Sequence, residues 1–191
     1  FLRFPHNKDL AYRVFNKKNE IFQPAKLQIV TVSQWLANQV KESTLLGNKP
    51  ISIIPNTLPL SKFKLLDSKE SRQILGLPEH AKILLFGAAR IDDPIKEFHL
   101  LLNAIQHLIT QGIYRKDELY LVTFGTYKYP KESIPHIPIS YTNMGWVKDS
   151  DILSQLYSSA NIVISSSLYE TFGQTLIEAQ ACGCIPISFG N

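Results

Sequence analysis

The sequence predicts an α/β protein in which helices cover both faces of a doubly wound parallel sheet. The first observation behind this prediction is that short, uninterrupted apolar runs recur along residues 51–191. Such runs are typical of strands that are buried on both faces. The second observation is that helical patterns separate these runs, as crossovers between parallel strands require. In folds of this kind, ligands bind beyond the carboxyl ends of the strands.

Residues 1–49 are predicted to be the remnant of a first domain. Apolar residues among Lys and Arg indicate helical segments, and Ser33 is a residue type that favours a helix N-cap. A breaker, Gly47-Asn-Lys-Pro50, ends this region, so we assign residues 50–191 to a second domain. The elements predicted for the first region are a helix over 7–22, a strand over 27–31 and a helix that begins after Ser33.

The second domain alternates strands with helices. Apolar residues three and four positions apart predict a helix over 98–109, and Gly76 with Pro78 ends an earlier helix. Residues 126–138 hold three prolines and are predicted to form a loop. The predicted strands span 51–54, 82–86, 119–124, 139–144, 161–165 and 185–188. Of the other predicted helices, one spans 68–75, one begins at Asp149 or Ser150, and the last ends near Cys182.

The net charge of +4 is concentrated at the front of the chain. Residues 1–50 hold eight Lys and Arg against three Asp and Glu, whereas residues 51–191 hold twelve against thirteen. A basic N-terminal part indicates either contact with an anionic membrane surface or simply a solvated face of the protein. Nucleic acid is disfavoured because no aromatic platform or zinc-finger spacing accompanies the basic residues. No apolar run reaches the roughly 18 residues of a membrane span.

The two cysteines, Cys182 and Cys184, are separated by one residue. Neighbours this close bridge poorly, so the sequence indicates reduced thiols and a cytoplasmic setting. The chain starts with Phe rather than Met, and we expect it to be a piece of a longer protein.

The most informative passage runs from Glu170 through Phe172-Gly173-Gln-Thr175 into a helix that contains Glu178. A turn at Phe172-Gly173 leaves backbone amides bare, and the N-terminus of the following helix attracts a phosphate. A carboxylate accepts hydrogen bonds from adjacent hydroxyls, so one Glu suits a hexose and the other a ribose. Two solvated carboxylates are the alternative, but the whole constellation favours a polyol phosphate ligand.

Two cations, Arg90 and Lys96, lie in the loop that follows the predicted strand 82–86. Most Arg and Lys side chains are simply solvated. At the carboxyl edge of a parallel sheet, however, two cations can neutralise a diphosphate and the charge that develops on a leaving group. Beside the glutamate passage, the functional interpretation is favoured.

Three other patterns are set aside. Asp149-Ser-Asp151 has the spacing of a metal-binding pair, but it opens a helix, where Asp is favoured as a cap. The five His residues are scattered, and no order of Ser, Cys, His and Asp indicates a nucleophile with its base. Gly87-Ala-Ala does not match a Gly-x-Gly-x-x-Gly loop, which leaves a dinucleotide cofactor with weak support.

These residues resemble a known family. Glu170 and Glu178 with Phe172-Gly173, followed by Glu-Ala-Gln-Ala-Cys-Gly183-Cys-Ile-Pro186, resemble the signature of glycosyltransferase family 4, retaining enzymes that use nucleotide sugars. The resemblance covers about residues 27–191. It implies the C-terminal, Rossmann-like half of a GT-B fold, truncated here, together with the end of the N-terminal domain. Lys96 departs from the pattern, because the family usually has Lys-Gly and Glu97 follows here.

The resemblance also implies roles for individual residues. Arg90 and Lys96 would bind the diphosphate, Glu170 would contact the transferred sugar, and Glu178 would take the ribose hydroxyls. No metal or other cofactor is expected. The further residues implied to border the donor are Gly87 in the diphosphate loop, Phe172, Gly173, Gln174 and Thr175 at the turn into the helix, and Trp146 and Val147 beside the base.

The first hypothesis is therefore the donor-binding part of a retaining glycosyltransferase that moves a hexose or N-acetylhexosamine from a UDP- or GDP-sugar. The acceptor would be a glycan or a lipid-linked sugar, in bacterial surface polysaccharide synthesis such as O-antigen, lipopolysaccharide or capsule. The protein would be cytoplasmic, with peripheral contact at the inner face of the membrane left open. The alternatives are a sugar-nucleotide epimerase, a phosphorylase, or a non-catalytic binding module. The 191 residues alone are expected to be inactive.

Overall fold

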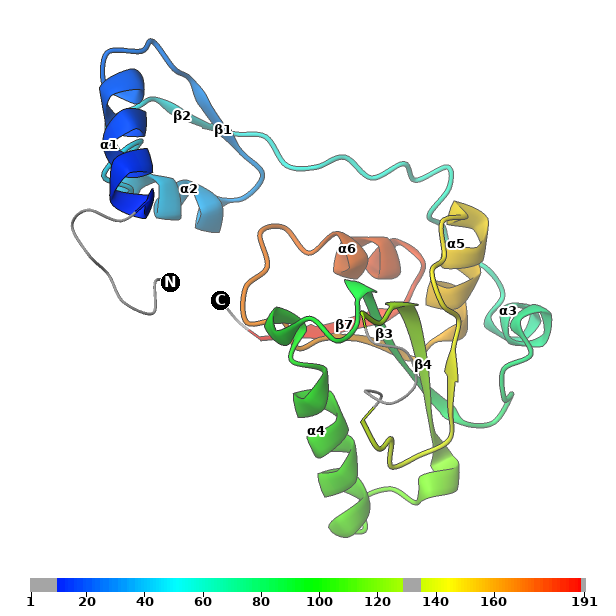
Figure 1. Cartoon of the computed structure of the whole chain (residues 1–191). Helices are drawn as coiled ribbons and strands as arrows, with labels where there is room; N and C mark the ends of the chain where they lie inside the picture. The colour runs from blue at the N-terminus through cyan, green and yellow to red at the C-terminus, as the bar shows by residue number, and fades with distance from the viewer. Residues whose placement is uncertain (1–9, 129–134, 190–191) are drawn as a thin grey trace. The chain divides into compact units, whose positions relative to one another are not determined.

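The computed structural model describes residues 10–128 and 135–189 (Figure 1). The chain separates into two compact units, one up to Asn56 and one from Thr57. This division falls later than the sequence-based assignment of 1–49 and 50–191. The difference arises because the strand at 51–53 pairs with a strand of the first unit.

The first unit contains a parallel pair of short strands and two helices. Its elements are α1 (Leu10–Phe22), β1 (Ile29–Thr31), α2 (Gln34–Glu42) and β2 (Ile51–Ile53), with Ile29 opposite Ile51 in the strand pair. The predicted cap is confirmed, because the Ser33 Oγ accepts a hydrogen bond from the Leu36 amide at 3.2 Å. Residues 7–9 of the predicted first helix lie outside the described residues.

The second unit is built on a five-stranded parallel sheet in the order β5-β4-β3-β6-β7. The predicted α/β fold with a doubly wound parallel sheet is therefore confirmed. The chain first runs outward from the central strand to β4 and β5, and then returns to the other side of β3 for β6 and β7. The strand bounds are β3 Lys82–Arg90, β4 Leu119–Thr126, β5 Tyr141–Asn143, β6 Ile162–Ser165 and β7 Ile185–Ser188.

Helices cover the two faces of this sheet unequally. One face packs against α3 (Ser68–Leu75), α5 (Ser150–Ser159) and α6 (Gln174–Ala181), with Leu85, Val122, Leu156 and Val163 fully buried between them. The other face packs against α4 (Phe98–Thr110). Successive residues of β3 point to opposite faces, as expected for a strand covered on both sides, so Leu84 lies in the second core.

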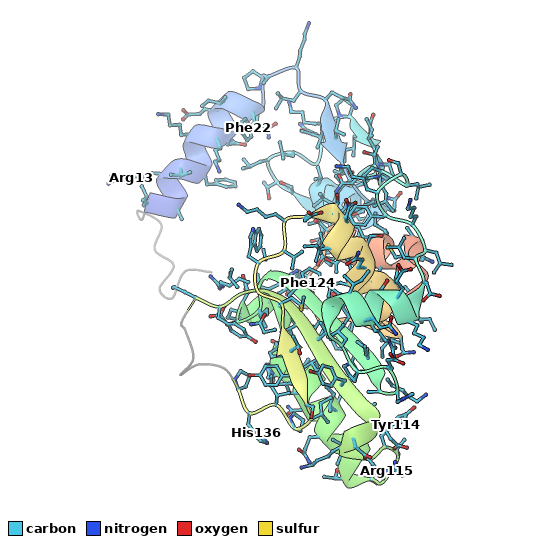
Figure 2. The ribbon with its side chains drawn as sticks, turned by 90° about the vertical axis from the view of Figure 1, so that its right-hand side faces the viewer. Arg13, Phe22, Tyr114, Arg115, Phe124 and His136 are labelled. Carbon is cyan, nitrogen blue, oxygen red and sulfur yellow. The ribbon has the colours of Figure 1, made fainter. Side chains whose placement is uncertain are left out.

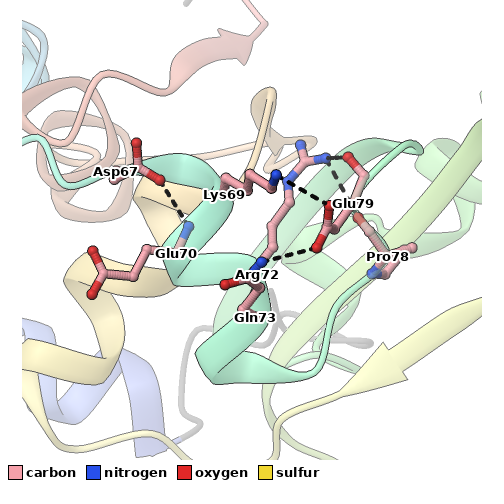
Figure 3. A network of polar contacts seen from close by, with 7 residues as sticks. All are labelled: Asp67, Lys69, Glu70, Arg72, Gln73, Pro78 and Glu79. Carbon is pink, nitrogen blue, oxygen red and sulfur yellow. Dashed lines mark hydrogen bonds and ion pairs between the residues drawn. The ribbon is translucent and has the colours of Figure 1, made fainter.

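A buried guanidinium ties α3 to the sheet (Figure 3). Arg72 donates to the backbone carbonyls of Glu79 at 2.7 Å and Ser159 at 2.9 Å, and to the Asn161 side chain at 3.0 Å. Burial lowers the pKa of Arg72 from its ordinary value. Because these acceptors precede β3 and β6, the one side chain fixes where both central strands begin.

The strands β3 and β4 run further than the sequence predicts. The predicted strand 119–124 stops just before Gly125, yet Gly125 lies inside β4, opposite a register irregularity between Gly87 and Arg90. A Cβ at Gly125 would meet the Ala88 carbonyl oxygen, and the residue has φ of 129°. Gly125 therefore permits a close approach of two strands rather than a chain stop.

Candidate nucleotide-sugar site

A pocket of about 180 Å³ opens where the strand order reverses, between the carboxyl ends of β3 and β6. This is the place where open α/β sheets bind ligands. The start of α6 closes its third side. The lining residues are Phe86, Gly87, Ala88, Ala89, Lys96, Ile164, Ser165, Ser167, Glu170, Gly173, Gln174, Thr175 and Leu176. The structure thus brings together six of the predicted site residues.

Lys96 and Glu170 face each other in this pocket. The Lys96 Nζ lies 3.0 Å from the Glu170 Oε2, although the two residues are 74 positions apart. Lys96 ends the short 3-10 helix η1 (Pro94–Lys96), which Asp93 caps through a hydrogen bond from the Ile95 amide. Both side chains are about one third exposed, so a ligand can reach them.

The loop that carries Lys96 is fastened to the loop after β6. The Ser166 hydroxyl donates to the Lys96 carbonyl at 2.8 Å, and it also lies 3.0 Å from the Glu97 carbonyl. The Leu168 amide donates to the Ile95 carbonyl at 2.9 Å. The two pocket walls are therefore held at a fixed separation by hydrogen bonds near their ends.

The N-terminus of α6 is open toward the pocket. Gly173 is its N-cap, with φ of 80°, and no side chain caps the helix. Within the described residues, the Leu176 amide bonds back to the Gly173 carbonyl at 2.9 Å, whereas the first two amides, of Gln174 and Thr175, precede the first intrahelical bond and carry the positive end of the helix dipole. Because Gln174 and Thr175 line the pocket, this end of the helix can receive a phosphate.

Glu178 lies one turn further along α6, outside the residues that line the pocket. The Gln174 amide nitrogen donates to its Oε1 at 3.1 Å, and the Tyr157 hydroxyl donates to its Oε2 at 2.8 Å. Burial, and then the charge of Glu178, raise the pKa of Tyr157 well above its ordinary value. In the described part of the chain, neutral donors rather than an ion pair hold the Glu178 carboxylate.

Arg90 is placed differently from Lys96. Its guanidinium lies 3.3 Å from Asp92 and 3.4 Å from Asp93, and the residue is outside the described lining of the pocket. The structure thus separates the two cations that the sequence analysis grouped. For Arg90 to reach a ligand in the pocket, it must leave these two carboxylates.

Gly87 forms part of the pocket floor, and a side chain has no room there because an aromatic ring occupies the space beside it. A Cβ at this position would come within 2.0 Å of the Phe124 ring. The Phe124 ring in turn packs edge-on against Tyr157, with ring centroids 6.0 Å apart. Figure 2 shows Phe124 at one end of the sheet and Tyr114 with Arg115 at the other.

The predicted base-binding pair and Phe172 lie beyond the described lining of the pocket. Trp146 is 52% exposed, whereas Val147 packs partly against the core beneath α5. The Gly125 amide donates to the Gly145 carbonyl at 2.7 Å, which places Trp146 just beyond the carboxyl end of β4. Phe172 is half-buried. Their contacts with a donor stay a prediction.

Several residues at the site were missed by the sequence analysis. Ser165 and Ser167 line the pocket, Ser166 fastens the Lys96 loop, and Tyr157 holds Glu178. The signal for the serines was present, because three polar residues directly follow a buried strand at its carboxyl end. Tyr157 carried no such signal, since it reads as one more half-apolar position of a helix.

The interpretation of Asp149 as a helix cap is confirmed. Its side chain accepts from the Asp151 amide at 2.8 Å at the start of α5. Within residues 10–128 and 135–189, no group of three or more His, Cys, Asp or Glu is arranged to hold a metal ion. In the same ranges, no helix is long and apolar enough to cross a membrane.

Comparison with known families and relatives shows which proteins this chain is similar to. Residues 81–190 match the model of the family described as Glycosyl transferases group 1. A D-inositol 3-phosphate glycosyltransferase of Catenulispora acidiphila is 31% identical over 163 residues, which are 78% of this chain and 38% of that protein. The chain therefore spans well under half of this curated relative.

Solved structures share the fold. Sucrose-phosphate synthase from Thermosynechococcus elongatus has a TM-score of 0.72 at 21% identity, covering 98% of this chain and 46% of the synthase. The Anabaena protein Alr3699/HepE, solved with UDP-glucose, has a TM-score of 0.69 at 16% identity, covering 94% of this chain and 49% of that protein. At these identities the likeness concerns the fold.

Proposed function

The chain belongs to the family Glycosyl transferases group 1, and on this premise we propose that it binds the nucleotide-sugar donor of a hexosyltransferase. The chain spans 38% of a curated relative, so the catalytic activity is proposed for a longer protein of which this chain is a part. The 191 residues alone are proposed to be inactive, because the acceptor would be bound elsewhere.

One observation carries the proposal: a single pocket at the sheet's reversal point combines a cation, a carboxylate and an uncapped helix N-terminus. A nucleoside diphosphate sugar has a matching order of groups. Its diphosphate fits Lys96 and the amides of α6, and its sugar hydroxyls fit Glu170. Glu178, one turn along α6, is proposed to accept the ribose hydroxyls.

The proposed reaction transfers a hexose or N-acetylhexosamine with retention of configuration. The bond between the anomeric carbon and the diphosphate oxygen breaks, and the electron pair leaves with the diphosphate. The acceptor hydroxyl oxygen forms the new bond, and its proton passes to the departing diphosphate. Lys96 and the α6 amides stabilise the charge on that group, which is electrostatic catalysis rather than nucleophilic catalysis. Arg90 contributes only if donor binding draws it from Asp92 and Asp93.

The donor class is supported by what neighbouring structures hold. The Anabaena structures contain UDP, glucose or UDP-glucose, and starch synthase IV of Arabidopsis thaliana contains ADP. We keep a UDP- or GDP-sugar as the proposed donor and propose that no metal is needed. If the donor affinity falls when EDTA is added, the metal-free proposal is wrong.

A glycan or lipid-linked acceptor in bacterial surface polysaccharide synthesis remains the proposed setting, in the cytoplasm and at the inner face of the membrane. The helix α1 supports contact with an anionic surface, because it exposes Leu10, Val14 and Ile21 beside Arg13 and Lys17. Sedimentation with vesicles that contain phosphatidylglycerol should retain the chain, and Arg13→Gln with Lys17→Gln should release it. Equal retention of both proteins would refute this contact.

The central experiment is calorimetric titration of the 191-residue chain with UDP, GDP and UDP-glucose. We expect a nucleoside diphosphate to bind in the micromolar to millimolar range, and Glu170→Gln to weaken only the nucleotide sugar. The absence of binding at millimolar concentration of all three ligands would overturn the proposed function. Sugar transfer by the complete protein, abolished by Glu170→Gln, would separate an enzyme from a non-catalytic binding module.

A further inference from the structure

Glu178 is held by two donors that leave room for a ligand. A carboxylate has about four lone-pair positions, and Gln174 and Tyr157 each occupy one. One position on each oxygen remains for the two adjacent hydroxyls of a ribose. Both donors are neutral groups, so neither contributes a positive charge beside the carboxylate.

Tyr157 is itself held rigidly. It is 1% exposed and lies in α5, at the centre of the core beneath α6. Its ring packs edge-on against Phe124 and tilted against Phe63, with centroids 6.0 and 6.2 Å away. A ring fixed on two sides aims its hydroxyl in one direction. The hydroxyl remains a donor at any physiological pH because burial raises the pKa of Tyr157.

We infer that Tyr157 is a positioning residue, which fixes the Glu178 carboxylate for the ribose 2′ and 3′ hydroxyls and so makes the site select a ribonucleotide donor. The inference rests on the proposed function, in which Glu178 takes the ribose. Tyr157 acts through Glu178, whose Oε2 accepts a hydrogen bond from its hydroxyl at 2.8 Å. The selectivity for the nucleoside sugar is thus built into the core of the fold.

The second donor to Glu178, Gln174, links the ribose end to the phosphate end of the site. It lines the pocket and also donates to Glu178 at 3.1 Å. A carboxylate held only by Gln174 could rotate about its last side-chain bonds. The Tyr157 bond at 2.8 Å fixes the second oxygen, so both oxygens face the same ligand edge.

The test compares UDP and GDP with their 2′,3′-dideoxy analogues by titration of the 191-residue chain. Tyr157→Phe keeps the ring and removes the hydroxyl. We expect it to weaken the natural nucleotide about tenfold, the size of one charge-assisted hydrogen bond, and to leave the dideoxy analogue unchanged. Tyr120→Phe is the matched control. The Tyr120 hydroxyl lies 2.7 Å from the Thr142 hydroxyl, and neither residue belongs to the described lining of the pocket. This variant should change neither affinity.

A double-mutant cycle identifies the route. If Tyr157 acts through Glu178, the variant with Tyr157→Phe and Glu178→Gln should bind UDP no more weakly than Glu178→Gln alone. Equal weakening of the natural and dideoxy nucleotides by Tyr157→Phe would show a general structural role and overturn the inference. So would unchanged discrimination in that variant. Failure of the wild-type chain to bind any nucleotide would instead overturn the proposed function on which the inference stands.

Discussion

The two loops that wall the pocket differ in how well their residues stay together. In the segment that leads from β6 into the first turn of α6, Glu170, Gly173, Gln174 and Thr175 all line one pocket. At the other wall, Lys96 lines the pocket and pairs there with Glu170, whereas Arg90, at the end of β3, pairs with Asp92 and Asp93 outside the described lining. The backbone of a strand-turn-helix junction fixes where its residues lie. A long, flexible Lys or Arg side chain, in contrast, pairs with whichever carboxylate is nearest.

The largest expected effect tests this difference between the cations. Lys96→Ala should weaken UDP binding about a hundredfold, because a charge-assisted contact to phosphate is worth up to about 3 kcal/mol. Arg90→Ala should weaken it less than about fivefold, since its guanidinium lies outside the described lining of the pocket and is paired with Asp92 and Asp93. Titration calorimetry measures both.

Lys82→Ala is the control for the loss of one positive charge, because Lys82 is exposed at the opposite end of β3. It should bind UDP like the wild type. If Arg90→Ala lowers the UDP affinity as much as Lys96→Ala does, the two cations do not differ in the way we expect, and Arg90 must leave its carboxylates when the donor binds. That result would restore the joint role that the sequence predicted for the two cations.

The sequence predicted the site best where chemistry and backbone coincide. Glu170 and Gly173 could be placed because a turn between a strand and a helix at the carboxyl edge of a parallel sheet has few geometries. Arg90 lies two and three residues before Asp92 and Asp93, but such a spacing does not by itself show that the side chains meet. Tyr157 could not be found, because its partner Glu178 lies 21 residues away on another helix.

The second prediction concerns the floor shared by both loops. Gly87→Ala would place a Cβ within 2.0 Å of the Phe124 ring, which is itself packed against Tyr157. The ring must move, and overpacking of this kind costs about 2 kcal/mol. We expect the thermal midpoint to fall by about 4–8 °C in scanning calorimetry. Phe124→Leu in the same chain should recover part of this loss, and an additive double variant would show that the ring is not the obstacle.

The fold was predictable in its order but less so in its strand ends. Apolar runs located β3, β4 and β6, because strands buried on both faces have no polar alternate positions, whereas the edge strand β5 is Tyr-Thr-Asn and largely exposed. Gly125 was misinterpreted, since a glycine inside a strand and a glycine that ends one look alike in a sequence. The pairing of β2 with β1 could not be read locally, because partner choice depends on contacts across the chain.

The third prediction sharpens the view of the β3 loop as the less regular wall. Glu97 has φ of 49° and ψ of 40°, the left-handed region that disfavours a Cβ. Glu97→Gly should therefore stabilise the unit by about 0.5–1 kcal/mol in urea unfolding, although it removes the 3.0 Å contact between the Glu97 carboxylate and the exposed His99 ring. Glu97→Ala, which keeps the Cβ, should give no gain. If the Gly variant has a lower free energy of unfolding than the Ala variant, the left-handed backbone at Glu97 does not destabilise the fold.

The smallest effect distinguishes the α6 wall, which buried neutral groups support, from the β3 loop, which ion pairs support. Burial raises the pKa of Cys184, between α6 and β7, from 9.0 to about 12. A thiol whose pKa is raised on folding stabilises the fold fully below its unfolded pKa, and this contribution is lost as the pH rises from about 9 toward 12. Urea unfolding under reducing conditions should thus show that wild type loses a few tenths of a kcal/mol more than Cys184→Ala between pH 7.5 and pH 9. An equal loss in both proteins would mean that the alkaline sensitivity does not arise from Cys184 on the α6 side.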